Sequence, residues 1–248
     1  MNASKSRLQL GILQCDEVRP ELRDRFGDYH EMVISALQAA DREIDCKNFR
    51  VFEGDFPDSI YSCDAWITTG SRSSVNDSTL WTRSLEDFVR QLSDADRIFV
   101  GICYGMQMMV KSLGGRVESV AAGWGIGVAS SHIYAREPWI TSAQKTVNLL
   151  VSHNEQVTEL PEGTRRIAGS TFCPNAIIGF GRAMIGLQGH PEFAREYSRA
   201  LMELRRGVIP DERIEIGLKS LEKRIDGSQV FGWITRFMRA TWTAELLG

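Results

Sequence analysis

The chain has 248 residues, with 29 Lys and Arg against 32 Asp and Glu, and its formal net charge is −3. At roughly 150 residues per domain, this length fits one large domain or two small ones. Hydrophobic residues make up 43% of the chain, enough for a sizeable core, which excludes a disordered chain. The small net charge gives no reason to expect nucleic acid as a partner. No apolar run approaches the ~18 residues of a membrane span, so no membrane partner is expected either.

The cysteines indicate the compartment. There are five, an odd number, scattered without a CxxC pair. This pattern is typical of a reducing cytoplasm and argues against both a disulfide framework and a zinc cluster. We therefore expect a cytoplasmic protein without a metal site. The five positions are Cys15, Cys46, Cys63, Cys103 and Cys173.

The first 115 residues alternate between strand-like and helix-like segments. Apolar runs predict strands at Arg7–Gln14, Asn48–Glu53, Asp64–Thr69 and Arg97–Ile102. Apolar residues at helical spacing predict helices at Tyr29–Ala40, Ser78–Leu92 and Tyr104–Leu113. Such alternation predicts an α/β fold with a doubly wound, mostly parallel sheet and helices on both faces.

The pattern changes after Gly123. Short β-like runs, separated by turns, predict an antiparallel or mixed part at Gly127–Ser131, Thr146–Val151, Arg166–Gly169, Ala176–Phe180 and Met184–Leu187. Helical spacing returns from Glu192 to Leu247 and predicts three helices. Because no linker or repeat interrupts the chain, we expect a single domain over residues 1–248, with 195–248 as a helical C-terminal extension.

The segment Gly101–Gly105 has the form G-x-C-x-G between an expected strand and an expected helix. It is the thiol version of the nucleophile elbow, a tight turn that lifts the nucleophile out of the carboxyl edge of the sheet. The start of the helix stabilises a thiolate, and the N–H of Tyr104 is placed to donate to an oxyanion. We expect Cys103 to be a nucleophile and the other four cysteines to be structural.

A thiol nucleophile needs a histidine base and a third group that orients it. Two of the four histidines lie in an expected helix or strand and are expected to be structural: His30 and His132. His190 follows a strand end, and we expect Pro191 to begin a helix. Glu192 can fold back onto the imidazole ring, fix its tautomer and stabilise the imidazolium.

Four segments together resemble a class I glutamine amidotransferase domain. They are TGS at 69–71, GICYGMQ at 101–107, SHNEQVTELP at 152–161 and GLQGHPEF at 186–193. The similarity covers about residues 7–195 and is strongest to stand-alone GMP-synthase-like glutamine amidotransferases and plant γ-glutamyl peptidases. The resemblance implies a flavodoxin-like core.

The resemblance also implies site residues. It implies a catalytic triad of Cys103, His190 and Glu192. It implies an oxyanion hole made by the backbone N–H groups of Ser71 and Tyr104.

Contacts to the γ-glutamyl group are implied as well, together with a contribution from the turn at Gly123–Gly127. The contacting residues would be Gly70, Gln107, Ser152 and His153. No metal or organic cofactor is implied.

The activity implied is hydrolysis of a γ-glutamyl amide through a thioester, which releases glutamate and an amine, or ammonia when glutamine is the substrate. Three departures from the family pattern bear on this expectation. Arg72 follows the Gly70-Ser71 pair where many members have GGP. Gly189 replaces a phenylalanine, which removes bulk beside the base. No ATP-dependent synthetase domain follows. The last two favour a self-sufficient hydrolase acting on a small-molecule substrate.

Two alternatives stay open. The chain could be an ammonia-supplying glutaminase subunit that requires a separate synthetase subunit, or a non-catalytic binding or regulatory protein on the same fold. The basic residues after Arg195 are expected to form a solvated face. A partner or homodimer surface, helped by Trp233 and Trp242, is the competing interpretation.

Overall fold

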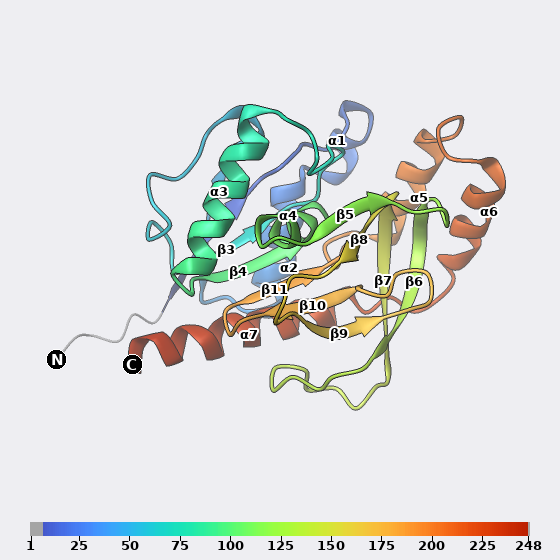
Figure 1. Cartoon of the computed structure of the whole chain (residues 1–248). Coiled ribbons are helices and arrows are strands. Elements are labelled where there is room, and N and C mark those ends of the chain that lie inside the picture. The colour runs from blue at the N-terminus through green and yellow to red at the C-terminus, as the bar shows by residue number, and fades with distance from the viewer. Residues whose placement is uncertain (1–6, 248) are drawn as a thin grey trace.

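The computed structural model describes residues 7–247. A nine-stranded sheet runs through the centre of the described chain in the order β2-β1-β3-β4-β11-β10-β9-β6-β7, and β5 and β8 form a separate pair (Figure 1). The strands are β1 (Leu8–Leu13), β2 (Ile44–Phe49), β3 (Ala65–Thr68), β4 (Ile98–Ile102), β5 (Arg116–Ser119), β6 (Gly125–Ile133), β7 (Thr146–His153), β8 (Glu155–Glu159), β9 (Arg165–Gly169), β10 (Ile177–Phe180) and β11 (Met184–Leu187). The helices are α1 (Pro20–Phe26), α2 (Tyr29–Ala40), α3 (Leu80–Asp94), α4 (Tyr104–Ser112), α5 (Arg195–Leu204), α6 (Asp211–Ser220) and α7 (Gly227–Leu247), with a 3₁₀ turn at Val51–Glu53.

The sheet has two halves that meet at β11. Strands β2, β1, β3, β4 and β11 pair in parallel. From β11 onward, β10, β9, β6 and β7 pair antiparallel. The predicted α/β class, with a mostly parallel central sheet, helices on both faces and additional C-terminal helices, is confirmed, as is the antiparallel character of the second half.

Alternating residues of the central strands supply two separate cores. On β4, Ile98, Val100 and Ile102 face a core shared with α2 and α7. Phe99 points the other way, into a core with α3 and α4. Because side chains of a strand alternate between faces, a strand that is apolar at every position must be covered on both sides. This explains why Arg97–Ile102 reads as a continuous apolar run.

Two predicted boundaries are wrong. The second strand is Ile44–Phe49 rather than Asn48–Glu53, and Val51–Glu53 forms a 3₁₀ turn. The strand lies at the edge of the sheet and pairs only with β1, so its middle residues stay polar and hide the pattern. Pro191 does not begin a helix, since residues 191–192 form a turn and α5 begins at Arg195.

Three elements escaped the sequence pattern. Helix α1 is seven residues long and buries only Leu22. Strands β5 and β8 pair with each other outside the main sheet, with one or two buried residues each. Such short elements are fixed by tertiary contacts and leave no clear periodicity.

The C-terminal helices are part of the core. Trp233 and Trp242 are 1% and 6% exposed and pack in the core beneath α2. They therefore do not form the partner surface considered from the sequence. Helix α7 packs against α2 and β4, and Arg239 donates from Nε to Asp41 Oδ2 at the end of α2 (2.8 Å).

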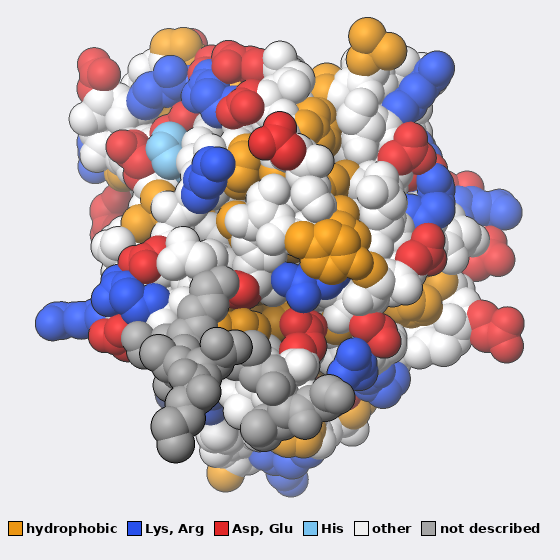
Figure 2. All heavy atoms as spheres, turned by 90° about the vertical axis from the view of Figure 1, so that its left-hand side faces the viewer, with side chains coloured by type: hydrophobic (Ala, Val, Ile, Leu, Met, Phe, Trp, Pro, Cys, Tyr) orange, Lys and Arg blue, Asp and Glu red, His pale blue; other side chains and the backbone are white. Residues whose placement is uncertain are grey.

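The surface carries charges of both signs. On the face shown in Figure 2, Lys and Arg side chains alternate with Asp and Glu around small hydrophobic areas. None of the helices in residues 7–247 is long and apolar enough to cross a membrane.

Replacing Phe231 of α7 tests whether the C-terminal extension stabilises the fold. Phe231 is fully buried, so Phe231→Ala is expected to lower the free energy of unfolding by about 3–5 kcal/mol. Ile216→Ala on α6, where the side chain is 56% exposed, is the control and should change it by less than about 0.5 kcal/mol. Urea denaturation measures both. If both substitutions changed the free energy of unfolding by the same small amount, α7 would not stabilise the fold.

Candidate active site

Cys103 occupies a strained turn between β4 and α4. Its φ of 48° and ψ of −97° lie in a region that L-residues rarely adopt, at a cost of roughly 1–3 kcal/mol. A β-carbon on Gly101 would lie 2.5 Å from the backbone nitrogen of Met106, and one on Gly105 would collide with Thr68. Both glycines are therefore required by close packing, as the elbow pattern predicts.

The other cysteines are placed as expected of structural residues. Cys15, Cys63 and Cys173 are buried and Cys46 is half-buried. Burial raises the pKa of Cys46 to about 11 and that of Cys173 to about 12, which keeps both as thiols at neutral pH.

His190 and Glu192 lie beside the thiol. His190 Nδ1 is 2.7 Å from Glu192 Oε1, and the two side chains are 6% and 0% exposed. The backbone N–H of His190 donates to Leu150 O (2.7 Å), which ties the histidine to β7. The ring of Phe193 stacks on the imidazole with centroids 4.0 Å apart and planes 6° apart.

The two neighbours of His190 favour its charged form. Burial alone would lower the pKa of His190, but the negative charges and hydrogen bonds of the Glu192 carboxylate and the Cys103 sulfur outweigh burial and raise its pKa to about 10. Glu192 Oε2 is buried without a hydrogen-bond partner in the described chain. The carboxylate thus acts on the imidazole alone.

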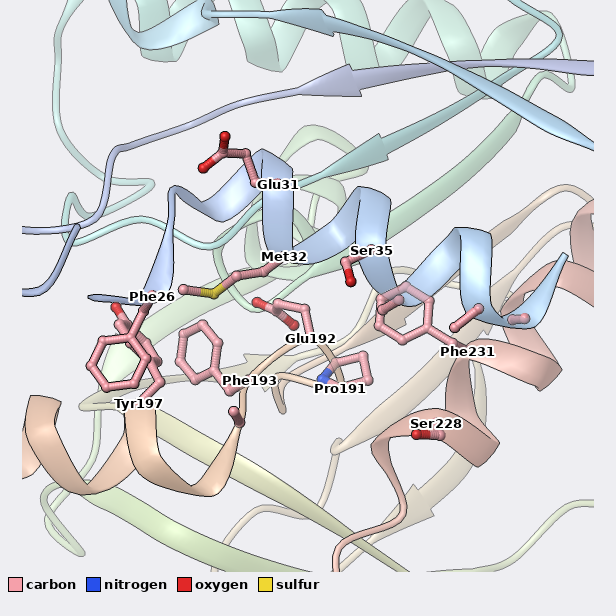
Figure 3. A pocket seen from close by; sticks show the side chains of 14 residues that line it. Phe26, Glu31, Met32, Ser35, Pro191, Glu192, Phe193, Tyr197, Ser228 and Phe231 are labelled. Carbon is pink, nitrogen blue, oxygen red and sulfur yellow. The ribbon is translucent and has the colours of Figure 1, made fainter. Parts of the chain in front are cut away.

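A cavity of about 570 Å³ lies behind the acid. It is lined by residues of α2, α5 and α7 together with Pro191, Glu192 and Phe193. Figure 3 shows Glu192 close to Met32 of α2, Pro191 and Phe193. Apolar side chains, with Glu31, Ser35 and Ser228, line this cavity, and the carboxylate forms one side-chain hydrogen bond within the described residues.

Gln188 also contacts the thiol. Its Nε2 donates to Cys103 Sγ (3.5 Å), and its Oε1 accepts from Gln107 Nε2 (3.2 Å). Sequence reasoning missed Gln188. The available signal was spacing, because residues two apart in an extended segment face the same side and Gln188 precedes His190 by two.

The loop after β3 lies across the nucleophile. A β-carbon on Gly70 would be 2.6 Å from His190 Cε1 and 3.7 Å from Cys103 Cβ. Ser71 lines the same pocket as Cys103. As the first residue of α4, Tyr104 has an N–H without an intrahelical acceptor. Ser71 thus shares a pocket with the thiol and Tyr104 follows it in the chain, and their role as oxyanion donors stays a prediction.

Arg72 fixes this loop. Its Nε and Nη2 donate to the two oxygens of Asp16 (2.8 and 2.7 Å), and its backbone N–H donates to Oδ2 (2.8 Å). The departure from the family pattern at this position therefore anchors the loop to the end of β1.

Cys103 opens into a pocket of about 370 Å³, which also contains three of the residues expected to contact substrate: Gln107, Ser152 and His153. Gln107 Nε2 donates to Glu155 O (2.9 Å) as well as to Gln188. His153 is buried, and burial lowers its pKa to about 4, so it is neutral at pH 7. Its Nδ1 lies 3.0 Å from Glu155 O.

Gly189 does not widen the pocket, contrary to expectation. A β-carbon there would lie 2.7 Å from Leu149 Cβ and 3.2 Å from Leu150 O. Leu149 and Leu150 of β7 fill the space beside Gly189, so the residue opens no room beside the base and gives no support to the expected self-sufficient hydrolase.

The model of the glutamine amidotransferase class-I family matches residues 24–203. The chain belongs to this family. Its chemistry is therefore hydrolysis of the glutamine amidotransferase type.

Two curated relatives of this class-I glutamine amidotransferase match most of its length. A glutamine amidotransferase-like protein of Schizosaccharomyces pombe is 27% identical over 92% of the chain and 98% of its own length. Gamma-glutamyl peptidase 4 of Arabidopsis thaliana is 24% identical over 80% of the chain and 82% of its own length. The crystal structure of a glutamine amidotransferase from Thermotoga maritima has the same fold, with a TM-score of 0.72 at 16% identity over 96% of this chain and 98% of that one.

No metal centre is visible among the described residues, since nowhere in 7–247 do three His, Cys, Asp or Glu side chains gather closely enough to hold an ion.

Glu192→Gln is expected to shift the titration of His190. With the carboxylate present, the raised pKa keeps the imidazolium at neutral pH; the histidine's contribution to stability is full below about 6.5 and is lost as the pH rises through about 10. Without this carboxylate only Cys103 opposes the effect of burial, so the titration midpoint should fall well below about 10. NMR of the imidazole protons measures it.

The exposed Glu196 provides the matched control, because Glu196→Gln should leave the titration of His190 where it is. His153 is an internal control that should not titrate above about pH 5. An unchanged midpoint in Glu192→Gln would mean that the carboxylate does not set the charge of His190.

Gly70→Ala is expected to displace His190, because the new β-carbon would overlap its ring. Alkylation of Cys103 by iodoacetamide, followed by mass spectrometry, should slow by about tenfold or more, and stability should fall by about 1–3 kcal/mol. Gly232→Ala on α7, where no atom lies within 3.4 Å, should leave both unchanged or gain slightly in stability. If Cys103 in Gly70→Ala reacted with iodoacetamide at the wild-type rate, the loop after β3 would not determine the position of His190.

Proposed function

We propose that this protein hydrolyses a γ-glutamyl amide bond through a γ-glutamyl thioester on Cys103. The observation that carries the proposal is the strained thiol at the mouth of a pocket, backed by a buried histidine whose Nδ1 is 2.7 Å from a carboxylate. The similarity to a gamma-glutamyl peptidase over most of both chains supports it.

The reaction divides into two displacements. In the first, Cys103 Sγ attacks the γ-carbonyl carbon, and the N–H groups of Ser71 and Tyr104 stabilise the oxyanion, each donor being worth about 3–4 kcal/mol. His190 then gives its proton to the leaving nitrogen, the C–N bond breaks and the amine departs.

In the second, His190 takes a proton from water, which attacks the thioester. The C–S bond breaks, glutamate leaves, and the sulfur departs as a thiolate beside the imidazolium of His190, which restores the starting ion pair. Glu192 orients His190 throughout and stabilises its charged form. Gln188, which donates to the sulfur, would hold the thiol toward the substrate.

Cys103→Ala is expected to abolish glutamate release by the purified chain. The assay compares γ-glutamylglycine, γ-glutamyl methylamide and glutamine, because the nucleophile is needed for each and its loss should cost on the order of 10⁶ in turnover. Cys46→Ala, which removes a half-buried thiol elsewhere, is the control and should keep wild-type activity.

Two results would contradict the proposal. Release that persists in Cys103→Ala would exclude the thiol mechanism. No release from any substrate by the wild type, with Cys103 still alkylated by iodoacetamide, would favour the glutaminase subunit of a two-component amidotransferase.

A further inference from the structure

The pocket that opens beside Cys103 is lined by two arginines that form no ion pair with a carboxylate in the described chain, although Glu155 lines the same pocket. The two are Arg19 and Arg205. Other arginines that lose solvent do find such partners: Arg72 pairs with Asp16, and Arg97 pairs with Glu245 at 3.1 Å. Arg19 and Arg205 therefore differ from these paired arginines, and their positive charge can act on a ligand in the pocket.

Arg205 reaches the pocket from the end of α5 and is held by neutral groups. Its Nη1 donates to Ser152 Oγ (2.6 Å), and its guanidinium lies over the ring of Trp124, 5.4 Å from the centroid. These contacts orient the side chain without neutralising it. Ser152, expected from the sequence to contact substrate, accepts a hydrogen bond from Arg205 and so helps to hold its side chain.

The surroundings of Arg205 disfavour the charged form of its guanidinium group. Burial lowers the pKa of Arg205; Tyr29 and Tyr197 oppose this effect, Arg19 adds to it through its like charge, and Cys103 opposes it. Arg19 Nε is buried and has no hydrogen-bond partner in residues 7–247. A carboxylate in the pocket would relieve both, since guanidinium groups bind carboxylates with short, charge-assisted hydrogen bonds.

We propose that Arg205, assisted by Arg19, binds a carboxylate of the substrate and so fixes the γ-glutamyl amide with its carbonyl carbon at Cys103. This inference rests on the proposed function. A γ-glutamyl substrate offers two sources of that group: the α-carboxylate of its glutamyl half, and a carboxylate on the leaving amine when this is an amino acid or peptide. Arg205 is in either case the residue that determines which amides are accepted.

The test measures binding without turnover. In a Cys103→Ala background, calorimetry compares three probes: γ-glutamylglycine with both carboxylates, γ-glutamyl methylamide with only the α-carboxylate, and 4-aminobutyrylglycine with only the carboxylate of the leaving group. Arg205→Gln should weaken binding by about tenfold or more wherever the relevant carboxylate is present. Arg205→Lys keeps the charge but loses the planar donor pair, so it should lose less.

The pattern across probes identifies the source. Weaker binding of both γ-glutamyl probes alone assigns the site to the α-carboxylate, and weaker binding of both glycine-containing probes alone assigns it to the leaving group; either supports the proposal. Arg206→Gln, next in sequence but exposed and paired with Glu203 and Glu215, is the matched control and should bind all three as the parent does.

Two outcomes would overturn the proposal. In the first, Arg205→Gln in the Cys103→Ala background binds all three probes with affinities within twofold of those of Cys103→Ala alone. In the second, Cys103→Ala binds none of the probes. Thermal unfolding of each variant separates lost binding from lost folding, and Arg19→Gln provides a second variant, expected to weaken the same probes less. Because binding is measured without the nucleophile, failure of this inference is distinct from failure of turnover in the wild type.

Discussion

The close approach of α4 to the carboxyl ends of β3 and β4 is the constraint on which the site depends. Gly105 lies directly against Thr68, whose Oγ1 also accepts the backbone N–H of Ile102 (3.1 Å). Only a residue without a side chain lets the helix begin this near the sheet. That geometry forces Cys103 into its left-handed conformation and aims the start of α4 at the thiol. The strain is held in place by two buried cores, one on each face of the sheet.

The parallel half of the sheet positions Cys103, and the chain that follows β11 toward the antiparallel half positions His190. Strand β11 pairs with β4, and the N–H of Cys103 donates to Leu187 O (2.7 Å). The chain then continues through Gln188 to His190, which is fixed by Leu150 of β7. Residues 103 and 190 therefore meet because adjacent strands end at the same edge. The pairing of β11, rather than any contact between the side chains alone, sets the position of the histidine.

The features that the sequence predicts well are local. The elbow, the His190–Glu192 spacing, and strands that are apolar throughout are each encoded within a few residues, and the structure has them where expected. The edge strand Ile44–Phe49 is buried mainly at its two ends, so its pattern resembles a loop. Gln188 and Arg205 gain their meaning from partners far away in the chain, which no local pattern contains. The same applies to Gly189, because the space that its missing side chain would occupy is filled by β7, which lies far away in the sequence.

The site separates two uses of buried charge. The carboxylate of Glu192 has a single hydrogen-bond partner in the described chain, and mostly apolar side chains line the cavity behind it. An ion pair buried in this way contributes little net stability, because desolvation offsets the attraction. The physical effect of the pair is to keep the imidazole of His190 protonated and in one orientation.

Arg205 is the opposite case, a cation without a carboxylate partner in the described chain, on the pocket side of Cys103. A fold selected for stability alone would neutralise that guanidinium, as it does Arg72 with Asp16. The desolvation of Arg205 is therefore better explained by a negative group that arrives with the substrate.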